Sequence, residues 1–182
     1  MMTTALQPAT ASRKKMKYIM AGALLVGLAV FFMSATVKFL AADFKGEWTF
    51  NESKSKLAEG RFRMNAKKIK ITQDADAITI ERTTAGQNGD DMVTSEKLTF
   101  DGKTTETTVF GNSKKKSTAA WSADGGQLTI NGTIFFERDG NTFEIKTVEV
   151  WKLGEGGKTL SIEATTTSQR GTTNNTFVYD KN

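Results

Sequence analysis

Three charged residues fall where an alternating pattern calls for apolar side chains. Arg82, Glu96 and Glu149 are in register with hydrophobic residues that recur at every second position, which is the period of a strand with one buried face. A buried charge is costly unless it is paired. We therefore expect one of three arrangements: the charges pair with one another, they face a wet cavity, or the predicted register is wrong. A bulge nearby would exchange Glu149 with Val150.

Other chemistry is poorly supported by the residue types present. Two inward carboxylates could serve glycoside hydrolysis, but that reaction requires a defined separation that spacing along strands does not establish. The chain has no Cys and no His, which excludes disulfides, the usual zinc ligands and Ser-His or Cys-His catalysis. Asp74, Asp76, Asp90 and Asp91 lack the ligand spacing of a calcium loop, and we interpret them as acidic turns. We expect a protein that is not an enzyme, with no catalytic residues, metal or cofactor.

The positive charge of the chain lies in its first 42 residues. The formal net charge is +5, but five of the 25 basic residues and none of the 20 acidic residues precede Asp43. The remainder is formally neutral, so we expect no binding to nucleic acid. The one basic run left is Lys114-Lys115-Lys116, which we interpret as a solvated strand edge that discourages aggregation.

The clearest local pattern is a hairpin from Gln127 to Leu153. Asp139-Gly140 predicts a type I′ turn between two alternating segments. The alternating apolar residues are Leu128, Ile130, Ile134 and Phe136 before the turn, and Phe143, Ile145, Trp151 and Leu153 after it. Asn131-Gly132 could itself be a turn, but we prefer a bulge inside one long strand.

The rest of the chain after residue 42 repeats this unit. About ten short strands are predicted between Phe44 and Tyr179, joined mostly by turns that contain Gly, and no helical period is present. The first is predicted at Phe44–Phe50 and another at Lys103–Phe110. The only proline is Pro8, so no strand lacks a ladder donor. We predict an all-β, antiparallel up-and-down barrel of about 8–10 strands.

A barrel of this size has room for a small ligand. The residues predicted to line a ligand pocket are Arg82, Glu96, Phe136, Phe143, Ile145, Glu149, Trp151 and Phe177. In this interpretation the charged residues orient a polar head group and the others contact an apolar part. In the alternative, the charges lie near strand ends in solvent and the aromatic residues fill the core.

Residues 1–42 have the layout of a secretory leader. A basic segment at Arg13–Lys17 precedes a continuous apolar run at residues 18–37, and Leu40-Ala41-Ala42 offers a cleavage site before Asp43. About 20 apolar residues span about 30 Å, so an uncleaved membrane anchor helix is the alternative. We predict a leader at 1–42 and an exported domain at 43–182, either periplasmic or extracellular, or held at the inner membrane. A start at Met16 would shorten the leader.

Gly46-Glu47-Trp48 resembles the opening of lipocalins, whose first strand carries Gly-x-Trp. Together with Trp151-Lys152-Leu153 and the closing Phe177-Val178-Tyr179-Asp180-Lys181, it makes Phe44–Asn182 similar to a group of exported bacterial lipocalin-like (calycin-type) proteins. The resemblance implies a barrel closed by Gly46 and Trp48, and it implies no catalytic residues. Two features depart from it: lipocalins end with a helix and place an Arg from the last strand against the Trp, whereas this chain ends in a strand and its late Arg170 is in a turn.

These patterns together predict an exported lipocalin-like protein that binds a small apolar or amphipathic molecule in the cell envelope. The alternative is a structural or interaction module with a filled core, tethered through residues 18–37. An interior pocket above about 300 Å³ lined by the predicted residues would favour binding. The sequence does not indicate an oligomeric state.

Overall fold

The described part of the chain is an all-β domain. The computed structural model describes residues 41–59, 65–86, 89–109, 113–138 and 140–182. The strands are β1 (Gly46–Phe50), β2 (Lys68–Gln73), β3 (Ala77–Ala85), β4 (Asp91–Thr99), β5 (Thr105–Thr108), β6 (Lys114–Trp121), β7 (Gln127–Arg138), β8 (Asn141–Gly154), β9 (Thr159–Ser168) and β10 (Gly171–Lys181). A 3-10 turn, η2 (Glu155–Gly157), joins β8 to β9. The predicted all-β class is confirmed.

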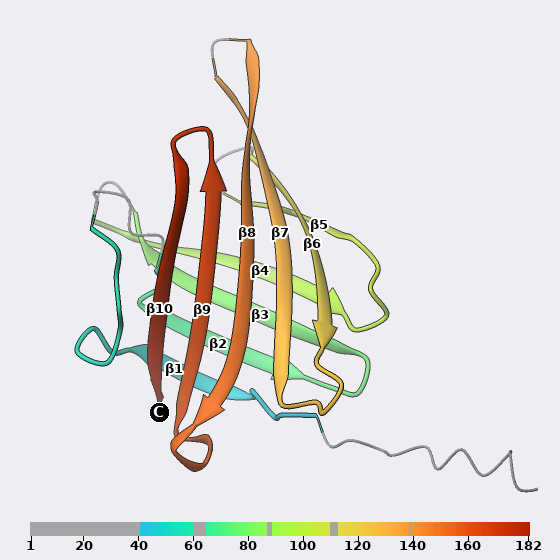
Figure 1. Ribbon diagram of the computed structural model, residues 1–182, viewed down its shortest axis with the longest axis vertical. Helices are drawn as coiled ribbons and strands as arrows, with labels where there is room; N and C mark the ends of the chain where they lie inside the picture. Colours follow the sequence, from blue (N-terminus) through green and yellow to red (C-terminus); the bar gives the residue numbers. More distant parts are fainter. Residues whose placement is uncertain (1–40, 60–64, 87–88, 110–112, 139) are drawn as a thin grey trace, which may run out of the picture. The chain divides into compact units, whose positions relative to one another are not determined.

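All ten strands belong to one antiparallel sheet, and strands that follow one another in sequence pair with each other except β4 and β5. The order is β4-β3-β2-β1-β10-β9-β8-β7-β6-β5, and β1 pairs with β10 through Trp48 and Lys181 among others. Strands β1 to β4 cross behind β6 to β10, so the sheet curls into a nearly closed barrel (Figure 1). Its two ends, β4 and β5, are not neighbours in the ladder. The predicted up-and-down barrel is confirmed.

Two strands are shorter than their patterns predict. β1 begins at Gly46, because the Phe44 N–H is bound by the Gln73 side-chain oxygen at 3.0 Å instead of joining a ladder. β5 begins at Thr105, because the Lys103 N–H is held in the preceding turn by the Asp101 carboxylate at 3.1 Å. In both cases a polar side chain captures a backbone donor that the alternation alone assigns to the strand.

The predicted bulge at Asn131-Gly132 is wrong. Asn131 pairs with Thr118 on one side and Val148 on the other, and the ladders continue through Gly132 without an extra residue. Gly132 instead leaves room for the side chains of Lys115 and Thr147.

The β7–β8 hairpin extends beyond its neighbours. β7 pairs with β6 only as far as Phe135, and β8 pairs with β9 only from Lys146. The segment beyond these points forms a projecting two-stranded ribbon (Figure 1). At its tip the last pair is Arg138 with Asn141, and Gly140 has φ +74°. Asp139 lies outside the described residues, so the type I′ turn stays a prediction.

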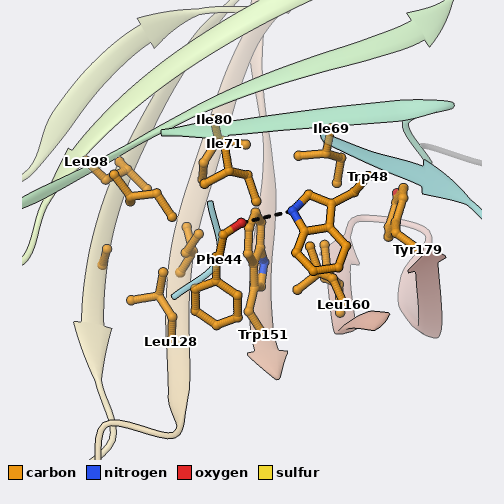
Figure 2. Packing of buried hydrophobic residues seen from close by; sticks show 14 of the residues in the cluster. Phe44, Trp48, Ile69, Ile71, Ile80, Leu98, Leu128, Trp151, Leu160 and Tyr179 are labelled. Atoms are coloured by element: carbon orange, nitrogen blue, oxygen red, sulfur yellow. Dashed lines mark hydrogen bonds between the residues drawn. The ribbon is translucent and has the colours of Figure 1, made fainter. Parts of the chain in front are cut away.

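The apolar core includes residues of strands β1 to β4 and β6 to β10, and Figure 2 shows how its largest members pack. Its buried members are Phe44, Trp48, Ala66, Ile69, Ile71, Ile78, Ile80, Leu98, Ala119, Leu128, Ile130, Trp151, Leu160, Ile162 and Tyr179. Phe44 stacks on Trp121 with ring centroids 5.7 Å apart and meets Trp151 edge-on at 5.8 Å. Phe44, in the segment before β1, therefore packs inside the core.

Trp48 lies at the filled end of the barrel and is fully buried. Its indole N–H donates to the Phe44 carbonyl at 2.9 Å (Figure 2). The Lys181 ammonium of the last strand lies 5.2 Å from the Trp48 ring centroid, a cation–π distance. A Cβ at Gly46, whose φ is +128°, would lie 3.0 Å from the Lys181 Cε. A lysine from β10 therefore covers the tryptophan, and Gly46 leaves room for it.

The predicted signal or anchor at residues 18–37 lies outside the described residues and stays a prediction. Among the residues that are described, no helix is long and apolar enough to cross a membrane.

Replacing Trp48 with Ala should lower the free energy of unfolding by about 3–5 kcal/mol, because it leaves a large cavity and removes the ring beneath Lys181. Urea unfolding followed by circular dichroism measures this change. Val93→Ala is the control, since Val93 is 63% exposed and should change stability by less than about 0.5 kcal/mol. A Trp48→Ala protein as stable as the control would contradict the role assigned to this residue.

Candidate functional site

The inner face of the barrel changes character along its length. Three successive cross-strand rows of β6 to β10 show this: Trp121, Leu128, Trp151, Ile162 and Phe177; then Ala119, Ile130, Glu149, Ala164 and Asn175; then Ser117, Gly132, Thr147, Thr166 and Thr173. The first row is large and apolar, and the third, which we call the small-residue belt, contains no residue larger than Thr. The side chains on this wall therefore become shorter over these three rows.

The opposite wall, formed by β3 and β4, changes in the same direction. Its inward pairs are Ile78 with Leu98, Ile80 with Glu96, Arg82 with Thr94, and Thr84 with Met92. The first of these pairs is fully buried, whereas Thr94, Thr84 and Met92 are only half-buried. Both walls are therefore packed at the Trp48 end and looser toward the ribbon end.

A network of ion pairs, the charged cluster, lies where the packed half meets the looser half. Arg82 contacts Glu149 at 2.6 Å and Glu96 at 3.8 Å, and Lys115 contacts Glu96 at 2.8 Å. The Trp151 indole N–H also donates to Glu149 at 2.9 Å. Glu149 keeps its inward register, since it pairs regularly across the strands without a bulge. Of the three predicted arrangements, mutual pairing is the one found.

Lys115 is the fourth member of the charged cluster, and its prediction as part of a solvated edge is wrong. Lys114 and Lys116 are exposed, but Lys115 is only 6% exposed. The physical reason is the strand period, because Lys115 shares its face with the inward-pointing Ser117. Burial of the ammonium is compensated by the Glu96 carboxylate.

Gly132 provides the space through which Lys115 enters the interior. A Cβ at this position would lie 2.8 Å from the Lys115 Cε and 2.6 Å from the Thr147 Oγ1. Any side chain here would have to displace one of them. The absent side chain therefore explains the Asn131-Gly132 sequence better than a bulge does.

The charged cluster favours the ionised forms of Glu96 and Arg82. Burial alone would raise the pKa of Glu96, but the charges of Lys115 and Arg82 outweigh burial and lower this pKa. Burial alone would lower the pKa of Arg82, yet Glu149 and Glu96 raise it. Counting formal charges, the cluster contains two cations and two anions.

Two buried polar atoms at this cluster have no hydrogen-bond partner among the described residues. They are the Glu96 Oε1 and the Ser117 Oγ. Ser117 is close enough to help lower the pKa of Glu96, but the two groups do not meet hydrogen-bond geometry. Such atoms are uncommon in folded proteins, and a bound molecule or water is a usual explanation.

The structure places the predicted ligand residues in four locations. Arg82, Glu96, Glu149 and Trp151 form one site with Lys115 and Ser117. Ile145 pairs with Ile134 on the inner face near the ribbon. The rings of Phe136 and Phe143 stack on the projecting ribbon with centroids 5.4 Å apart. The Phe177 ring packs against the Phe50 ring with centroids 6.4 Å apart.

Sequence reasoning missed Lys115, Ser117 as a polar site atom, and Gly132. The alternation on β6 was the signal that could have found Lys115 and Ser117.

A pocket of about 310 Å³ is present elsewhere, over β9 and β10. It is lined by Lys56, Glu163, Ala164, Thr165, Asn174, Asn175 and Thr176. None of the residues predicted to bind a ligand lines it. It lies where Lys56 forms a bridge to Thr176, so it is a product of the 51–59 segment packing along β10.

Comparison with known proteins identifies no family. No protein-family model matches the chain, and a search of curated proteins finds no match. A search of solved structures finds a crystal structure of zebrafish ileal bile acid-binding protein complexed with cholic acid, with 18% sequence identity and a TM-score of 0.47. The match covers 76% of this chain and 98% of that one. The resemblance to exported bacterial lipocalin-like proteins stays a prediction.

Replacing Lys115 with Met should lower the free energy of unfolding by about 3 kcal/mol, because it removes the closest partner of a buried carboxylate. Lys114→Met is a matched control one residue away, and as an exposed residue it should have an effect below about 0.5 kcal/mol. Denaturant unfolding measures the free energy of unfolding of both variants. Equal stabilities would show that Lys115 is not buried against Glu96.

Tyr179 should resist ionisation in the folded protein. Burial raises its pKa, and the nearby Arg82 charge offsets only part of this effect. The folded-state pKa is above the unfolded value of about 10, so stability is constant below pH ~10 and should fall above it by up to about 1.4 kcal/mol per pH unit. The chain has two tyrosines, Tyr18 and Tyr179. The difference in absorbance at 295 nm between wild type and Tyr179→Phe should therefore show no tyrosinate at pH ~11 while circular dichroism remains native. Titration near pH 10 in the folded state would contradict this assignment.

Proposed function

We propose that the domain binds a small apolar or amphipathic molecule inside the looser half of the barrel, above the charged cluster. The observation that carries this proposal is the contrast between the two halves of the inner face. The largest core residues at the Trp48 end, such as Trp48, Leu128 and Trp151, are fully buried, whereas the inward residues Ile145, Thr147 and Thr166 are only half-buried. An inner face that remains accessible and has polar groups converging at its base is typical of a ligand site.

The arrangement gives the ligand a direction. The Trp48 end is packed with the core, so entry is from the end where the ribbon projects. A polar group would reach the charged cluster, and an apolar part would lie against Ile134 and Ile145, with the stacked Phe136 and Phe143 at the rim. These contacts supply burial of apolar area, which is the main source of affinity for such molecules.

The second candidate is a non-enzymatic structural or interaction module of the envelope. The observations that favour it are the filled Trp48 half and the position of the 310 Å³ pocket on the β9–β10 surface, away from the charged cluster. In either case the basic and apolar leader of residues 13–37 supports export to the cell envelope, and neither candidate assigns a reaction to the domain.

Native mass spectrometry of the protein made by cells from the complete sequence tests ligand binding and export together. We expect a small apolar or amphipathic molecule at one per chain, identified after organic extraction, and a chain mass beginning at Asp43. A bare mass from gentle preparations would favour the interaction module. A mass that retains residues 18–37 would favour the membrane anchor.

A matched pair of variants then locates the site. Ile145→Arg places a charge on the inner wall and should weaken binding of the extracted molecule by about tenfold or more, because desolvating the charge opposes binding. Val148→Arg is the control, since Val148 is on the outer face of the same strand and is 39% exposed. Isothermal titration calorimetry compares the two. Equal losses, or none, would exclude this wall as the site.

A further inference from the structure

We infer that the charged cluster and Ser117 receive an uncharged hydroxyl, so that the preferred ligand is a neutral, hydroxyl-bearing amphiphile and not a carboxylate. This inference rests on the proposed function, because it assumes that a ligand occupies the looser half of the barrel. It goes further by naming the chemical group that the site recognises.

The first step is the charge balance of the cluster. Arg82 and Lys115 are matched by Glu96 and Glu149, at contact distances of 2.6, 2.8 and 3.8 Å. An added carboxylate would face two glutamates, and an added ammonium would face an arginine and a lysine. Either would leave one buried charge without a counter-charge, which is unfavourable at this depth. A neutral group avoids that cost.

The second step is the hydrogen-bonding capacity left over. Glu96 is 6% exposed and Ser117 is 1% exposed, and Glu96 Oε1 and Ser117 Oγ have no partner among the described residues. An ionised carboxylate oxygen can only accept, so Glu96 requires a donor, whereas Ser117 can donate or accept. A single hydroxyl can donate to Glu96 and accept from Ser117. A carboxylate ligand cannot donate to Glu96.

The third step is the set of residues around these atoms. Ser117 pairs across the ladder with Gly132, over which the Lys115 Cε and the Thr147 Oγ1 lie, and Thr147 and Thr166 continue the small-residue belt. Thr94 pairs with Arg82 on the opposite wall. Hydroxyl groups therefore accompany the charged side chains around the two unpaired atoms, as suits a ligand with one or more hydroxyl groups.

Three probes with comparable tails separate the possibilities in the wild-type protein: 1-dodecanol, 1-methoxyundecane and dodecanoate, each below its aggregation limit. The alcohol can donate, the ether can only accept, and dodecanoate is charged. Competition against a fluorescent apolar dye, with the complete chain as cells produce it, gives the three Kd values. We expect 1-dodecanol to bind about tenfold more tightly than either other probe, which corresponds to about 1.4 kcal/mol. Equal binding of alcohol and ether, or preference for dodecanoate, would overturn the inference.

A charge change at the cluster should reverse the preference. Glu96→Gln leaves the cluster with one excess positive charge, so dodecanoate should become the tighter ligand and 1-dodecanol should lose its advantage. Glu163→Gln is the matched control, because Glu163 is exposed and pairs with Lys152 at 3.0 Å on the outer face. This control should retain the wild-type order. An unchanged order in Glu96→Gln would contradict recognition by this carboxylate.

The same measurements distinguish failure of this inference from failure of the proposed function. If none of the three probes displaces the dye, and no molecule accompanies the purified protein, the barrel does not bind amphiphiles. If all three bind without discrimination, ligand binding stands and recognition of a hydroxyl does not. The comparison in the wild-type protein requires no substitution, so it remains decisive if Glu96→Gln fails to fold.

Discussion

The ion pair between Glu96 and Lys115 joins the two parts of the sheet that the backbone leaves unjoined. β4 and β5 are the ends of the ten-stranded order, and the Glu96 carboxylate on β4 meets the Lys115 ammonium on β6 at 2.8 Å. Arg82 extends the link to Glu149 on β8. Buried ion pairs contribute little net stability compared with apolar residues, but they penalise any arrangement that separates the partners. The cluster therefore specifies how the curled sheet closes.

Two lysine stems pass closely over glycines of neighbouring strands. Lys115 reaches the interior over Gly132, and Lys181 reaches across Gly46 to cover Trp48. In each case a Cβ on the glycine would lie within 3.0 Å of the lysine Cε. Because glycine has no side chain, a long aliphatic stem can lie close against the backbone of the neighbouring strand. One such crossing supports the charged cluster, and the other seals the packed end.

The fold class and the face of the sheet on which most side chains lie could be predicted from the sequence, because every long strand keeps the two-residue alternation. It placed Arg82, Glu96 and Glu149 on the inner face, with their pairing among three alternatives. It could not give the distance from Glu96 to Lys115, which depends on how the sheet curls. The position of Phe136 and Phe143 beyond the ends of β6 and β9 also depends on register between strands. Lys115 was predictable in principle, because the alternation along β6 places Lys115 on the opposite face from Lys114 and Lys116.

The two buried polar atoms without partners in the described part of the chain, Glu96 Oε1 and Ser117 Oγ, are hard to explain by stability alone. Leaving Glu96 Oε1 and Ser117 Oγ buried without partners carries a desolvation cost of about 1–3 kcal/mol for each group. An apolar pair at these positions would avoid that cost and could pack as well, since replacing buried ion pairs with apolar residues is often neutral or stabilising. The unpaired atoms are buried where the packed half meets the small-residue belt. The proposed ligand would account for these atoms, because it would supply the hydrogen bonds that the folded chain leaves open.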